Sequence, residues 1–478
     1  MGNDAFDVVV IGAGPGGYTA AIRASQLGLR TAIVEKRPEL GGTCLNVGCI
    51  PAKALLDATE FYTAIRDKAE RQGIHFDNLR FVLSEMMEKK RLAVERHTKG
   101  VALLMRENKI ETIRGSARIA APGRVRIAAD AGKVREVAAG SIVLATGSVP
   151  VPLPSVPFDG DRIISSDEAL SLDAVPDSLL VIGAGAVGLE IGSIWMRLGS
   201  RVTVIELMDQ VLPGADLQAA RALMQILKKQ GMEFSLSTSV SGCKTTGKKV
   251  ELTSKNSKGG EMTFTGDRVL VAVGRKPYLA ELGLEEAGVR LTEKGRVGVN
   301  ERYETSAGGI FAIGDIIDGP MLAHKAGEEG VAVAELIAGK AGHVNYDTIP
   351  GAVYTWPELA FAGLTEEQCR GRGIPIRTGL FFFRANSRGT TSDNSDGFVK
   401  IIAHEETDRV LGCSIVGPWA SDLIHELVIL MEFGGSSEDA ARTVHAHPSF
   451  SEAVREAALD VEGRALHTPP GLNIRRTE

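Results

Sequence analysis

A glycine-rich motif occurs twice in this chain, each time with the same neighbours. Each copy follows a short run of β-branched residues and precedes a helical stretch, after which a second strand ends in a glutamate. The first copy runs from Gly12 to the acid Glu35 and the second from Gly183 to Glu206, so both span 23 positions. This order is typical of dinucleotide-binding units. One copy alone would say little, but two at equal spacing predict an α/β chain with two Rossmann-like domains.

The glycines of each motif have separate tasks. In the first copy, Gly12 allows a tight turn, Gly14 lets the backbone approach a pyrophosphate, and Gly17 lets helix and strand pack closely. The N-terminus of the following helix offers free N–H groups and the positive end of its dipole to phosphates. The terminal acid can accept hydrogen bonds from a ribose diol. The corresponding residues of the second copy are Gly183, Gly185, Gly188 and Glu206.

The second unit also predicts which nicotinamide it takes. Glu206 stands where a carboxylate bonds a ribose 2′-hydroxyl and repels a 2′-phosphate. From Val202 through Ala220 the chain has no Lys or Arg to receive such a phosphate. NAD is therefore favoured over NADP.

Later segments indicate how the two units are joined. Each unit closes with an apolar strand and a glycine turn, at residues 142–147 and 269–274, and a third such strand precedes a Gly-Asp pair at 310–315. The second unit is therefore predicted to be inserted into the first. Beyond about residue 349, segments such as 398–402 suggest antiparallel strands, with helices at 421–434 and 449–460, which is typical of a mixed α+β domain. The predicted domains are residues 1–150, 151–276, 277–348 and 349–478.

Size and composition are those of an ordinary globular protein. The 478 residues leave ample chain for buried cores, and a net charge of −6 gives no sign of a nucleic-acid or membrane surface. No apolar run approaches the roughly 18–20 residues that span a bilayer, and the N-terminus lacks a secretory or transit signal. Five cysteines, an odd number, favour a reducing compartment. We expect a cytoplasmic protein that binds neither nucleic acid nor membrane, and no metal site is predicted.

Two cysteines, Cys44 and Cys49, lie five positions apart directly after the first nucleotide-binding unit. In an ideal helix their Cα atoms would be about 8.6 Å apart, whereas a disulfide needs roughly 4.4–6.8 Å. The segment must therefore be distorted, and Gly48 is the residue best able to supply an unusual backbone angle. Such a pair beside an electron carrier can act as a two-electron switch. The other cysteines are scattered, at Cys243, Cys369 and Cys413.

Four separated motifs occur here in one order: the cysteine motif, the doubled fingerprint, an Ala-Ile-Gly-Asp element at 312–315, and a late stretch from His445 to Glu452. Together they cover nearly the whole chain and resemble the flavoprotein disulfide reductase family. The resemblance implies FAD in the first Rossmann-like domain, a nicotinamide in the second, and a C-terminal dimerisation domain. It implies a homodimer with shared active sites, which oxidises a protein-bound dihydrolipoyl group and reduces NAD⁺ through a Cys44–Cys49 disulfide.

The resemblance also implies roles for individual residues. Cys44 is the sulfur that exchanges with substrate, and Cys49 is the one against the flavin. Lys53, on the same helical face as Cys49, is the cation near the flavin, and Glu190 is the acid that pairs with it. The further FAD residues are Thr43, Gly115, Thr146, Gly147, Ser148, Asp315, Met321 and Ala323, and the further NAD residues are Val240 and Gly274.

A base is needed because the thiolate, not the thiol, attacks a disulfide. Histidine titrates near neutrality, and a carboxylate on its far nitrogen fixes the tautomer. His447 is followed by proline and by Glu452, and it matches the family's base, whereas His445 is a supporting residue. We expect His447 of one subunit to deprotonate the substrate thiol, which then attacks Cys44 of the other.

Small departures from the family pattern leave every reacting group in place. Ala52 stands where serine is common, Tyr278 where asparagine is frequent, and Ser449-Phe450 where Thr-Leu is usual.

The sequence also bears on other functions within and beyond the family. A glutathione-type enzyme would carry basic residues after Val204, and a mercuric-type enzyme a cysteine pair near the C-terminus, yet the last cysteine is Cys413. A docking role within a 2-oxo acid dehydrogenase complex remains open beside catalysis. The chain carries no lipoyl domain, so we expect as partners the lipoyl domains and acyltransferase core of such a complex, or the lipoylated carrier of glycine cleavage.

Overall fold

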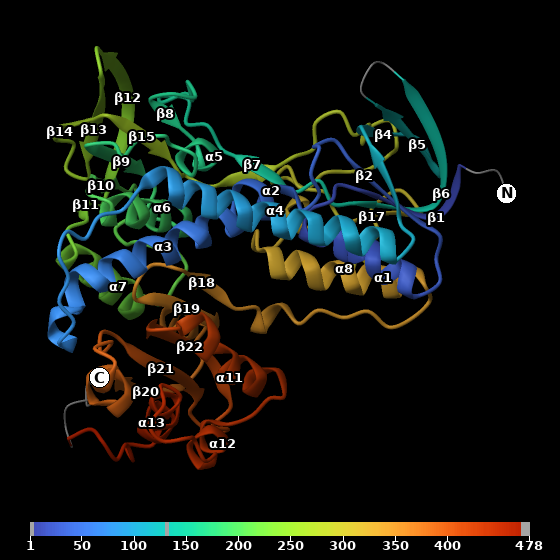
Figure 1. Ribbon diagram of the computed structural model, residues 1–478. Helices are drawn as coiled ribbons and strands as arrows, with labels where there is room; N and C mark the ends of the chain where they lie inside the picture. Colours follow the sequence, from blue (N-terminus) through green and yellow to red (C-terminus); the bar gives the residue numbers. More distant parts are fainter. Residues whose placement is uncertain (1–3, 130–132, 470–478) are drawn as a thin grey trace. The chain divides into compact units, whose positions relative to one another are not determined.

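The computed structural model describes residues 4–129 and 133–469. It divides into two compact units, each made of separate stretches of the chain. The first unit contains residues up to 55, 84–151 and 274–344, and the second contains 56–83, 152–273 and the chain from 345 onward. Figure 1 labels the elements of both units along the chain.

The first unit is built around one sheet. Its strands follow the order β3-β2-β1-β6-β5-β4, and β17 also pairs with β6. β1, β2, β3, β17 and the last part of β6 run parallel, whereas β4, β5 and the first part of β6 are antiparallel. The strands are β1 (Ala5–Ile11), β2 (Thr31–Glu35), β3 (Glu111–Arg114), β4 (Ser116–Ala121), β5 (Arg124–Ala128), β6 (Val134–Leu144) and β17 (Ile310–Ala312).

Helices cover this sheet, so its parallel strands are apolar along their length. In β1, for example, Val8, Val9 and Val10 are almost fully buried. Helices α1 (Pro15–Gln26) and α8 (Ala323–Ile337) lie side by side (Figure 1), and a Cβ added at Gly330 would lie 2.5 Å from the carbonyl oxygen of Gly16. The other elements are α2 (Gly42–Val47), the first turns of α3 (Cys49–Lys68), α4 (Leu83–Glu107), β7 (Ser148–Pro150), β16 (Arg275–Pro277) and η3 (Gly314–Ile316).

The second unit contains another parallel sheet, in the order β11-β10-β9-β15-β8. Its strands are β8 (Ile163–Ile164), β9 (Ser178–Ile182), β10 (Arg201–Ile205), β11 (Glu233–Ser235) and β15 (Arg268–Val271), with helices α5 (Ser166–Ala169), α6 (Ala186–Arg197) and α7 (Leu217–Lys229). An antiparallel sheet is formed by β12 (Thr238–Thr246), β13 (Lys249–Asn256) and β14 (Glu261–Gly266).

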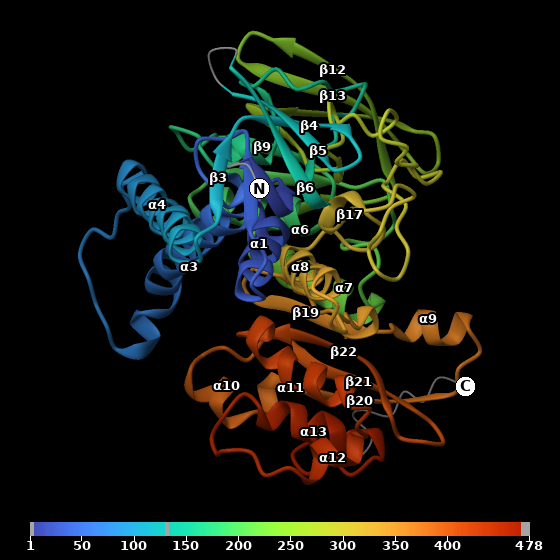
Figure 2. The same cartoon turned by 90° about the vertical axis from the view of Figure 1, so that its right-hand side faces the viewer.

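The C-terminal part of the second unit is an antiparallel sheet in the order β18-β19-β22-β21-β20. Helices α11, α12 and α13 gather on one side of it (Figure 2), over a core that includes Phe381, Ile401 and Leu427. The strands are β18 (Gly351–Val353), β19 (Glu358–Gly363), β20 (Ile376–Phe382), β21 (Phe398–His404) and β22 (Val410–Gly417). The helices are η4 (Tyr346–Thr348), α9 (Glu366–Gly371), η5 (Phe383–Ala385), α10 (Ser387–Thr391), α11 (Ala420–Glu432), α12 (Ser437–Arg442) and α13 (Glu452–Val461). The second unit also contains η1 (Glu70–Gln72), in its first stretch of chain.

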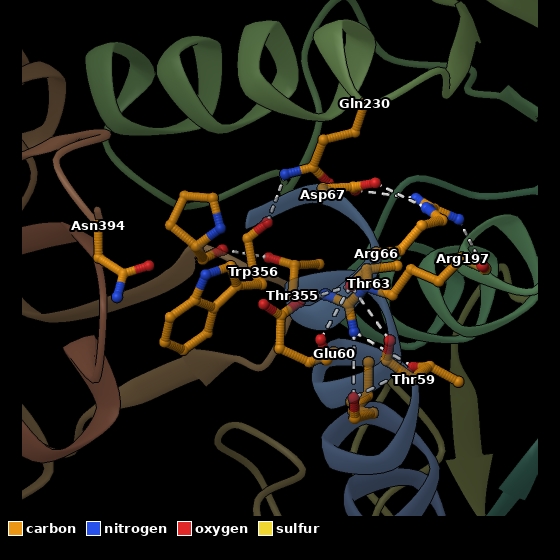
Figure 3. A network of polar contacts seen from close by, with 12 residues as sticks. Thr59, Glu60, Thr63, Arg66, Asp67, Arg197, Gln230, Thr355, Trp356 and Asn394 are labelled. Atoms are coloured by element: carbon orange, nitrogen blue, oxygen red, sulfur yellow. Dashed lines mark hydrogen bonds and ion pairs between the residues drawn. The ribbon is translucent and has the colours of Figure 1, made fainter. Parts of the chain in front are cut away.

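The later turns of α3 are fixed to α6 by a buried polar network (Figure 3). Arg197 donates to the carbonyl oxygen of Leu56 at 3.2 Å and to Thr59 Oγ1 at 3.4 Å, and its guanidinium lies 3.4 Å from the Glu60 carboxylate. Burial raises the pKa of Glu60 above its ordinary value, although Arg197 opposes that shift. The helix that begins at Cys49 is therefore anchored at its far end by a paired charge.

The predicted fold class is confirmed, with two Rossmann-like parallel sheets and a C-terminal α+β part. The chain returns to the first sheet through β17, as expected, while the four domain boundaries stay a prediction. One local expectation differs from the structure, since the helix predicted from 449 begins at Glu452. Residues 148–150 form β7, which pairs with β16. Within residues 4–129 and 133–469, we find no helix that is long and apolar enough to span a membrane.

Candidate active site

The first glycine loop connects β1 to α1 and leaves no room for a Cβ at two of its glycines, Gly12 and Gly17. Gly12 has a φ of +102°, and a Cβ there would overlap the carbonyl oxygen of Ala145. A Cβ at Gly17 would overlap the carbonyl oxygen of Gly12. Helix α1 begins after Gly14 and has no capping side chain, so its first N–H groups remain available to an anion.

The second glycine loop repeats this geometry between β9 and α6. Gly183 has a φ of +104°, and a Cβ there would lie 2.5 Å from the carbonyl oxygen of Ala272. A Cβ at Gly188 would overlap the carbonyl oxygen of Gly183. Helix α6 begins after Gly185, again without a capping side chain. Both loops therefore have the form that a pyrophosphate requires.

The two strand-ending acids hold these loops in place. Glu35 is buried, and its oxygens accept hydrogen bonds from the Ala13 amide at 2.9 Å and from the amide two positions after the acid, also at 2.9 Å. Glu206 makes the matching bonds, at 2.6 Å from the Ala184 amide and 2.8 Å from the amide two positions on. Sequence reasoning gave these acids a ribose contact alone, and the structure adds a second task, which is to fix the glycine loop.

Several predicted FAD residues gather at the carboxyl edge of the first sheet. Ser148 donates to Asp315 Oδ2 at 2.5 Å and accepts a bond from Arg275 Nε at 2.8 Å. Thr146 Oγ1 donates to the carbonyl oxygen of Tyr278 at 2.6 Å, and the Tyr278 amide donates to the carbonyl oxygen of Gly147 at 2.8 Å. These contacts connect β7 and the turn before it to η3, to β16 and to the residue after β16, so these predicted residues lie together.

Gly115 also belongs to this edge, where it joins β3 to β4. Its φ is +149°, and a Cβ there would lie 2.6 Å from the carbonyl oxygen of Ala128. Its amide donates to the carbonyl oxygen of Glu35 at 2.9 Å. Thr43 lies in the first turn of α2, and Met321 and Ala323 lie just before and at the start of α8.

A buried ion pair beneath Asp315 was missed by sequence reasoning. Lys325 and Glu329 are fully buried in α8, and their charged groups lie 3.1 Å apart. Glu329 accepts a bond from the Gly314 amide at 2.7 Å, and Lys325 donates to the Gly314 carbonyl oxygen at 3.1 Å. The i, i+4 spacing of the two residues reads as an ordinary helix pair, so only their burial distinguishes them.

The remaining NAD residues lie in the second unit or at its border. Glu190 is buried in α6 and accepts a hydrogen bond from the Tyr354 amide at 3.0 Å. Val240 lies in β12, where its carbonyl oxygen accepts a bond from Ser155 Oγ at 3.3 Å. Gly274 follows β15 with a φ of +124°. The pairing of Glu190 with Lys53 stays a prediction.

Cys44 and Cys49 lie on opposite sides of a helix break, as the spacing argument requires. Cys44 is in α2, Cys49 begins α3, and Gly48 separates them with φ −132° and ψ −110°. A Cβ at Gly48 would lie 3.0 Å from the carbonyl oxygen of Thr43, so the turn needs glycine for close approach. Both cysteines are in the thiol form in the structure.

The two sulfurs are close enough to influence each other. A hydrogen bond with Cys49, burial and the charge of Cys49 raise the pKa of the Cys44 thiol above its ordinary value, while Lys53 opposes the shift. Burial and the two cysteines also raise the pKa of Tyr18, which lies in α1. The cysteine pair, Lys53 and Tyr18 therefore share one electrostatic environment.

A cavity of about 770 Å³ opens beside Cys44 in the first unit. Its walls come from α1, α2, α4 and the starts of α3 and α8, and most of its lining surface is apolar. Residues of the wall include Tyr18, Leu45, Ile50, Leu104 and His324. A cavity of this size is within the range that small-molecule and cofactor sites occupy.

His447 and Glu452 form a second group of reactive side chains in the second unit. His447 Nδ1 lies 2.9 Å from Glu452 Oε1, and Glu452 Oε2 accepts a bond from the Ser449 amide at 2.9 Å. Partial burial alone would raise the pKa of Glu452, but the bonds from Ser449 and His447 outweigh it and lower that pKa. His447 is 70% exposed, so its other ring nitrogen is open to a reactant.

His445 makes a separate contact and is shielded. Its Nε2 lies 2.5 Å from Glu426 Oε1, its Nδ1 lies 2.8 Å from the carbonyl oxygen of Thr443, and its side chain is 6% exposed. His445 and His447 therefore contact different carboxylates, those of Glu426 and Glu452.

Comparisons with known proteins agree over almost the whole chain. It is 47% identical to a protein of Pisum sativum named dihydrolipoyl dehydrogenase, mitochondrial, over 98% of this chain and 93% of that protein. It is 49% identical to one of Vigna unguiculata named leghemoglobin reductase, over 96% of this chain and 88% of that protein. The crystal structure of LpdA from Mycobacterium tuberculosis has a TM-score of 0.87 at 28% identity, covering 94% of this chain and 98% of that one.

A family model described as pyridine nucleotide-disulphide oxidoreductase matches residues 6–330, and its dimerisation domain matches residues 349–458. These matches confirm the prediction of an oxidoreductase that uses FAD and NAD(H) and that carries a dimerisation domain at its C-terminal end. This chain therefore belongs to the pyridine nucleotide-disulphide oxidoreductase family.

Proposed function

We propose that this chain oxidises a protein-bound dihydrolipoyl group to its cyclic disulfide and reduces NAD⁺. The observation that carries the proposal is the pair of hydrogen-bonded thiols, Cys44 and Cys49, beside a cavity in the first unit. The relative of Pisum sativum at 47% identity, named dihydrolipoyl dehydrogenase, supports the choice of substrate.

The residues of the first unit fit FAD. A Cβ is excluded at Gly12 and Gly17, the uncapped start of α1 offers N–H groups to phosphates, and Glu35 ends the second strand, the position of the ribose-binding acid in dinucleotide-binding units. Further residues proposed to hold it are Gly14, Gly17, Thr43, Lys53, Gly115, Thr146, Gly147, Ser148, Asp315, Met321 and Ala323. When bound, FAD supplies a two-electron carrier between the cysteine pair and the nicotinamide.

The second unit fits NAD in the same manner. Its loop repeats the geometry of the first, and Glu206 presents a carboxylate where a 2′-phosphate would be repelled. Residues proposed to hold NAD are Gly183, Gly185, Gly188, Glu190, Glu206, Val240 and Gly274.

His447 is proposed as the base for the substrate dithiol. Its Nδ1 is held by Glu452, so Nε2 is the nitrogen that takes a proton from a substrate thiol. The resulting thiolate attacks Cys44 Sγ of the closed Cys44–Cys49 disulfide. A substrate–Cys44 bond forms, the bond between the two cysteines breaks, and its electron pair goes to Cys49.

The second substrate thiol completes the exchange. Its sulfur attacks the substrate sulfur that is bonded to Cys44, its proton passes to the departing Cys44 sulfur, and the cyclic disulfide is released. The electron pair of the broken bond returns to Cys44, which takes up a proton because its pKa is raised. The substrate has then lost two protons and two electrons, and the cysteine pair has gained the electrons.

The remaining partners are proposed from the family and from the substrate that this reaction requires. The dimerisation domain supports a homodimer in which His447 of the partner subunit acts on Cys44. The lipoyl domains and acyltransferase core of a 2-oxo acid dehydrogenase complex, or the lipoylated carrier of glycine cleavage, would present the substrate. The odd number of cysteines favours a reducing compartment, and we propose the cytoplasm.

The cysteine assignment is tested with Cys44→Ser and Cys49→Ser, and with Cys243→Ser as the control. Each variant is purified with FAD, and reduction of NAD⁺ by dihydrolipoamide is followed at 340 nm. We expect both pair variants to lose turnover and Cys243→Ser to keep it, because Cys243 lies in β12 of the second unit and is not one of the proposed site residues. Wild-type turnover in either pair variant would contradict the proposed route.

The same assay separates the alternatives. A glutathione-type enzyme would oxidise NADPH with glutathione disulfide, and a mercuric-type enzyme would do so with Hg²⁺. A docking protein would bind the acyltransferase core without turning over free dihydrolipoamide. We expect NAD⁺-dependent oxidation of dihydrolipoamide, with NADP⁺ refused.

A further inference from the structure

Asn386 is a buried side chain that reaches the loop carrying His447. It lies at the N-terminus of α10, where its Oδ1 accepts a hydrogen bond from the Gly389 amide at 2.8 Å. Its Nδ2 donates to the carbonyl oxygen of Ser449 at 2.9 Å, 63 positions further along the chain. The side chain therefore joins a helix cap to the loop of the proposed base.

Ser449 is held on its other side by the carboxylate that holds the base. Its amide donates to Glu452 Oε2 at 2.9 Å, and Glu452 Oε1 lies 2.9 Å from His447 Nδ1. The hydrogen bonds thus run in series from Asn386 through the backbone of Ser449 and the carboxylate of Glu452 to the imidazole. Both backbone polar groups of Ser449 are used in this series.

The side chains of Ser449 and Phe450 in this loop do not orient it by hydrogen bonds within the described residues. The Ser449 hydroxyl is buried and has no hydrogen-bond partner within the described residues, so it does not fix the turn. Phe450 packs against Phe383 and Trp419, with ring centroids 6.0 and 5.2 Å away, which holds the loop by apolar contact. The bond from Asn386 adds a directional contact to this packing, at the carbonyl oxygen of Ser449.

We propose that Asn386 is a positioning residue for the His447–Glu452 pair. By fixing the Ser449 backbone, it sets where Glu452 lies and hence the direction in which His447 presents its open ring nitrogen. The inference rests on the proposed function, in which that nitrogen takes a proton from the substrate thiol. Small misplacements of a reacting group are costly, and about 1 Å can reduce a rate by roughly a hundredfold.

Substitution by serine separates this role from helix capping. Serine caps helices about as well as asparagine, so Asn386→Ser keeps the acceptor for the Gly389 amide. Its hydroxyl is too short to reach the Ser449 carbonyl oxygen as well. Asn386→Asp is a second variant, because it also keeps a cap acceptor but sets a carboxylate oxygen against that carbonyl.

A matched control exists elsewhere in the second unit. Asn345 also accepts a bond from a backbone amide, that of Asp347 at 3.2 Å, and also donates through Nδ2, to Glu432 Oε2 at 2.8 Å. Neither partner belongs to the His447 loop. Asn345→Ser therefore removes a bond of the same kind without touching the proposed series.

Two half-reactions of the FAD-loaded full chain are compared by stopped-flow absorbance. Reduction by dihydrolipoamide requires the proposed base, whereas reduction by NADH does not. We expect Asn386→Ser to slow the dithiol half-reaction roughly ten- to hundredfold, to leave the NADH half-reaction within about twofold, and Asn345→Ser to change neither. A dithiol half-reaction of wild-type speed, or an equal loss in both half-reactions, would overturn the assignment.

A double variant gives a readout that a merely structural role would not produce. In a His447→Gln background, Asn386→Ser should slow dithiol reduction no further, because its effect passes through the imidazole. An additional tenfold loss in that background would refute the positioning role.

A crystal structure of Asn386→Ser tests the positioning without turnover. We expect the His447–Glu452 bond to be lengthened beyond hydrogen-bond distance or the imidazole to adopt more than one orientation. An unchanged pair would refute the inference even if the protein proves inactive toward dihydrolipoamide. Inactivity of the wild-type protein toward that dithiol would instead refute the proposed function, so the two failures are distinguishable.

Discussion

Replacing Glu206 with glutamine tests the double task of the acid at the end of β10. In the structure its two oxygens accept bonds from the amides of Ala184 and Met208 at 2.6 and 2.8 Å, and the side chain is buried. Glutamine keeps one acceptor oxygen but puts an NH₂ group where the other acceptor was. Whichever way the amide turns, one backbone N–H then faces a donor.

The magnitude follows from the kind of bond that is lost. A hydrogen bond to a charged group contributes about 1.5–3 kcal/mol, and about 1.4 kcal/mol corresponds to a tenfold change in binding. If nucleotide binding must restore the loop order that this bond provides, affinity for NADH falls roughly 10- to 150-fold. NADPH should remain a poor substrate, because no Lys or Arg lies between Val202 and Ala220.

The assay is steady-state oxidation of NADH and NADPH by the FAD-loaded protein with ferricyanide as acceptor. We expect the KM for NADH to rise at least tenfold in Glu206→Gln, with a smaller change in kcat. Glu35→Gln is the matched control, since its two bonds, both 2.9 Å long, hold the first loop in the same manner. That variant should lose FAD faster on dilution, while the molecules that keep FAD retain the wild-type KM for NADH.

Two results would refute this reasoning. An unchanged KM for NADH in Glu206→Gln would mean that the acid does not organise the loop for its nucleotide. A raised KM for NADH in FAD-loaded Glu35→Gln would mean that the two loops do not serve separate nucleotides.

Three further predictions concern stability and the cysteine turn. Lys400→Met should lower the free energy of unfolding by about 3–5 kcal/mol, seen as a lower thermal midpoint, because the buried ammonium holds Asp216 at 2.8 Å and Glu366 at 2.6 Å. Burial tends to raise the pKa of Glu452, but its hydrogen bonds outweigh burial and lower that pKa from 4.5, so the ionised carboxylate stabilises the folded protein above this value. This stabilisation is lost as the pH falls through the folded pKa. The free energies of urea unfolding of wild type and Glu452→Gln should therefore converge on acidification. Gly48→Ala should slow disulfide closure in a timed thiol titration, because its Cβ would lie 3.0 Å from a backbone oxygen.

The glycine loops could be predicted from the sequence because their constraints are local. Gly12 and Gly17 are excluded from carrying a Cβ by atoms of the same strand-turn-helix unit and of the adjoining strand end, and the pattern repeats at Gly183 and Gly188. The distortion between Cys44 and Cys49 followed likewise from chain geometry alone. Such features require only that a segment of about 30 residues adopt its own preferred form.

The buried charges could not be predicted in this way. Lys400 lies in a strand, 184 positions from Asp216 and 34 from Glu366, and a lone lysine in a strand reads as solvent-exposed. Asn386 and Ser449 are likewise 63 positions apart, so their hydrogen bond could not be predicted from either segment alone. Their chemistry depends on which segments pack together, and one sequence does not contain that information.

Glu206 shows that one position in the sequence can carry a second role that the motif does not reveal. The spacing of 23 positions from Gly183 was interpreted as placing a carboxylate near a ribose, yet the same spacing places it beneath the Ala184 amide. A change to NADP requires removal of the negative charge, but that removal also takes away the acceptor of a buried N–H. Replacement of Glu206 by arginine alone would therefore disorder the loop it was meant to adapt, and an effective change of cofactor must supply another acceptor for the Ala184 amide.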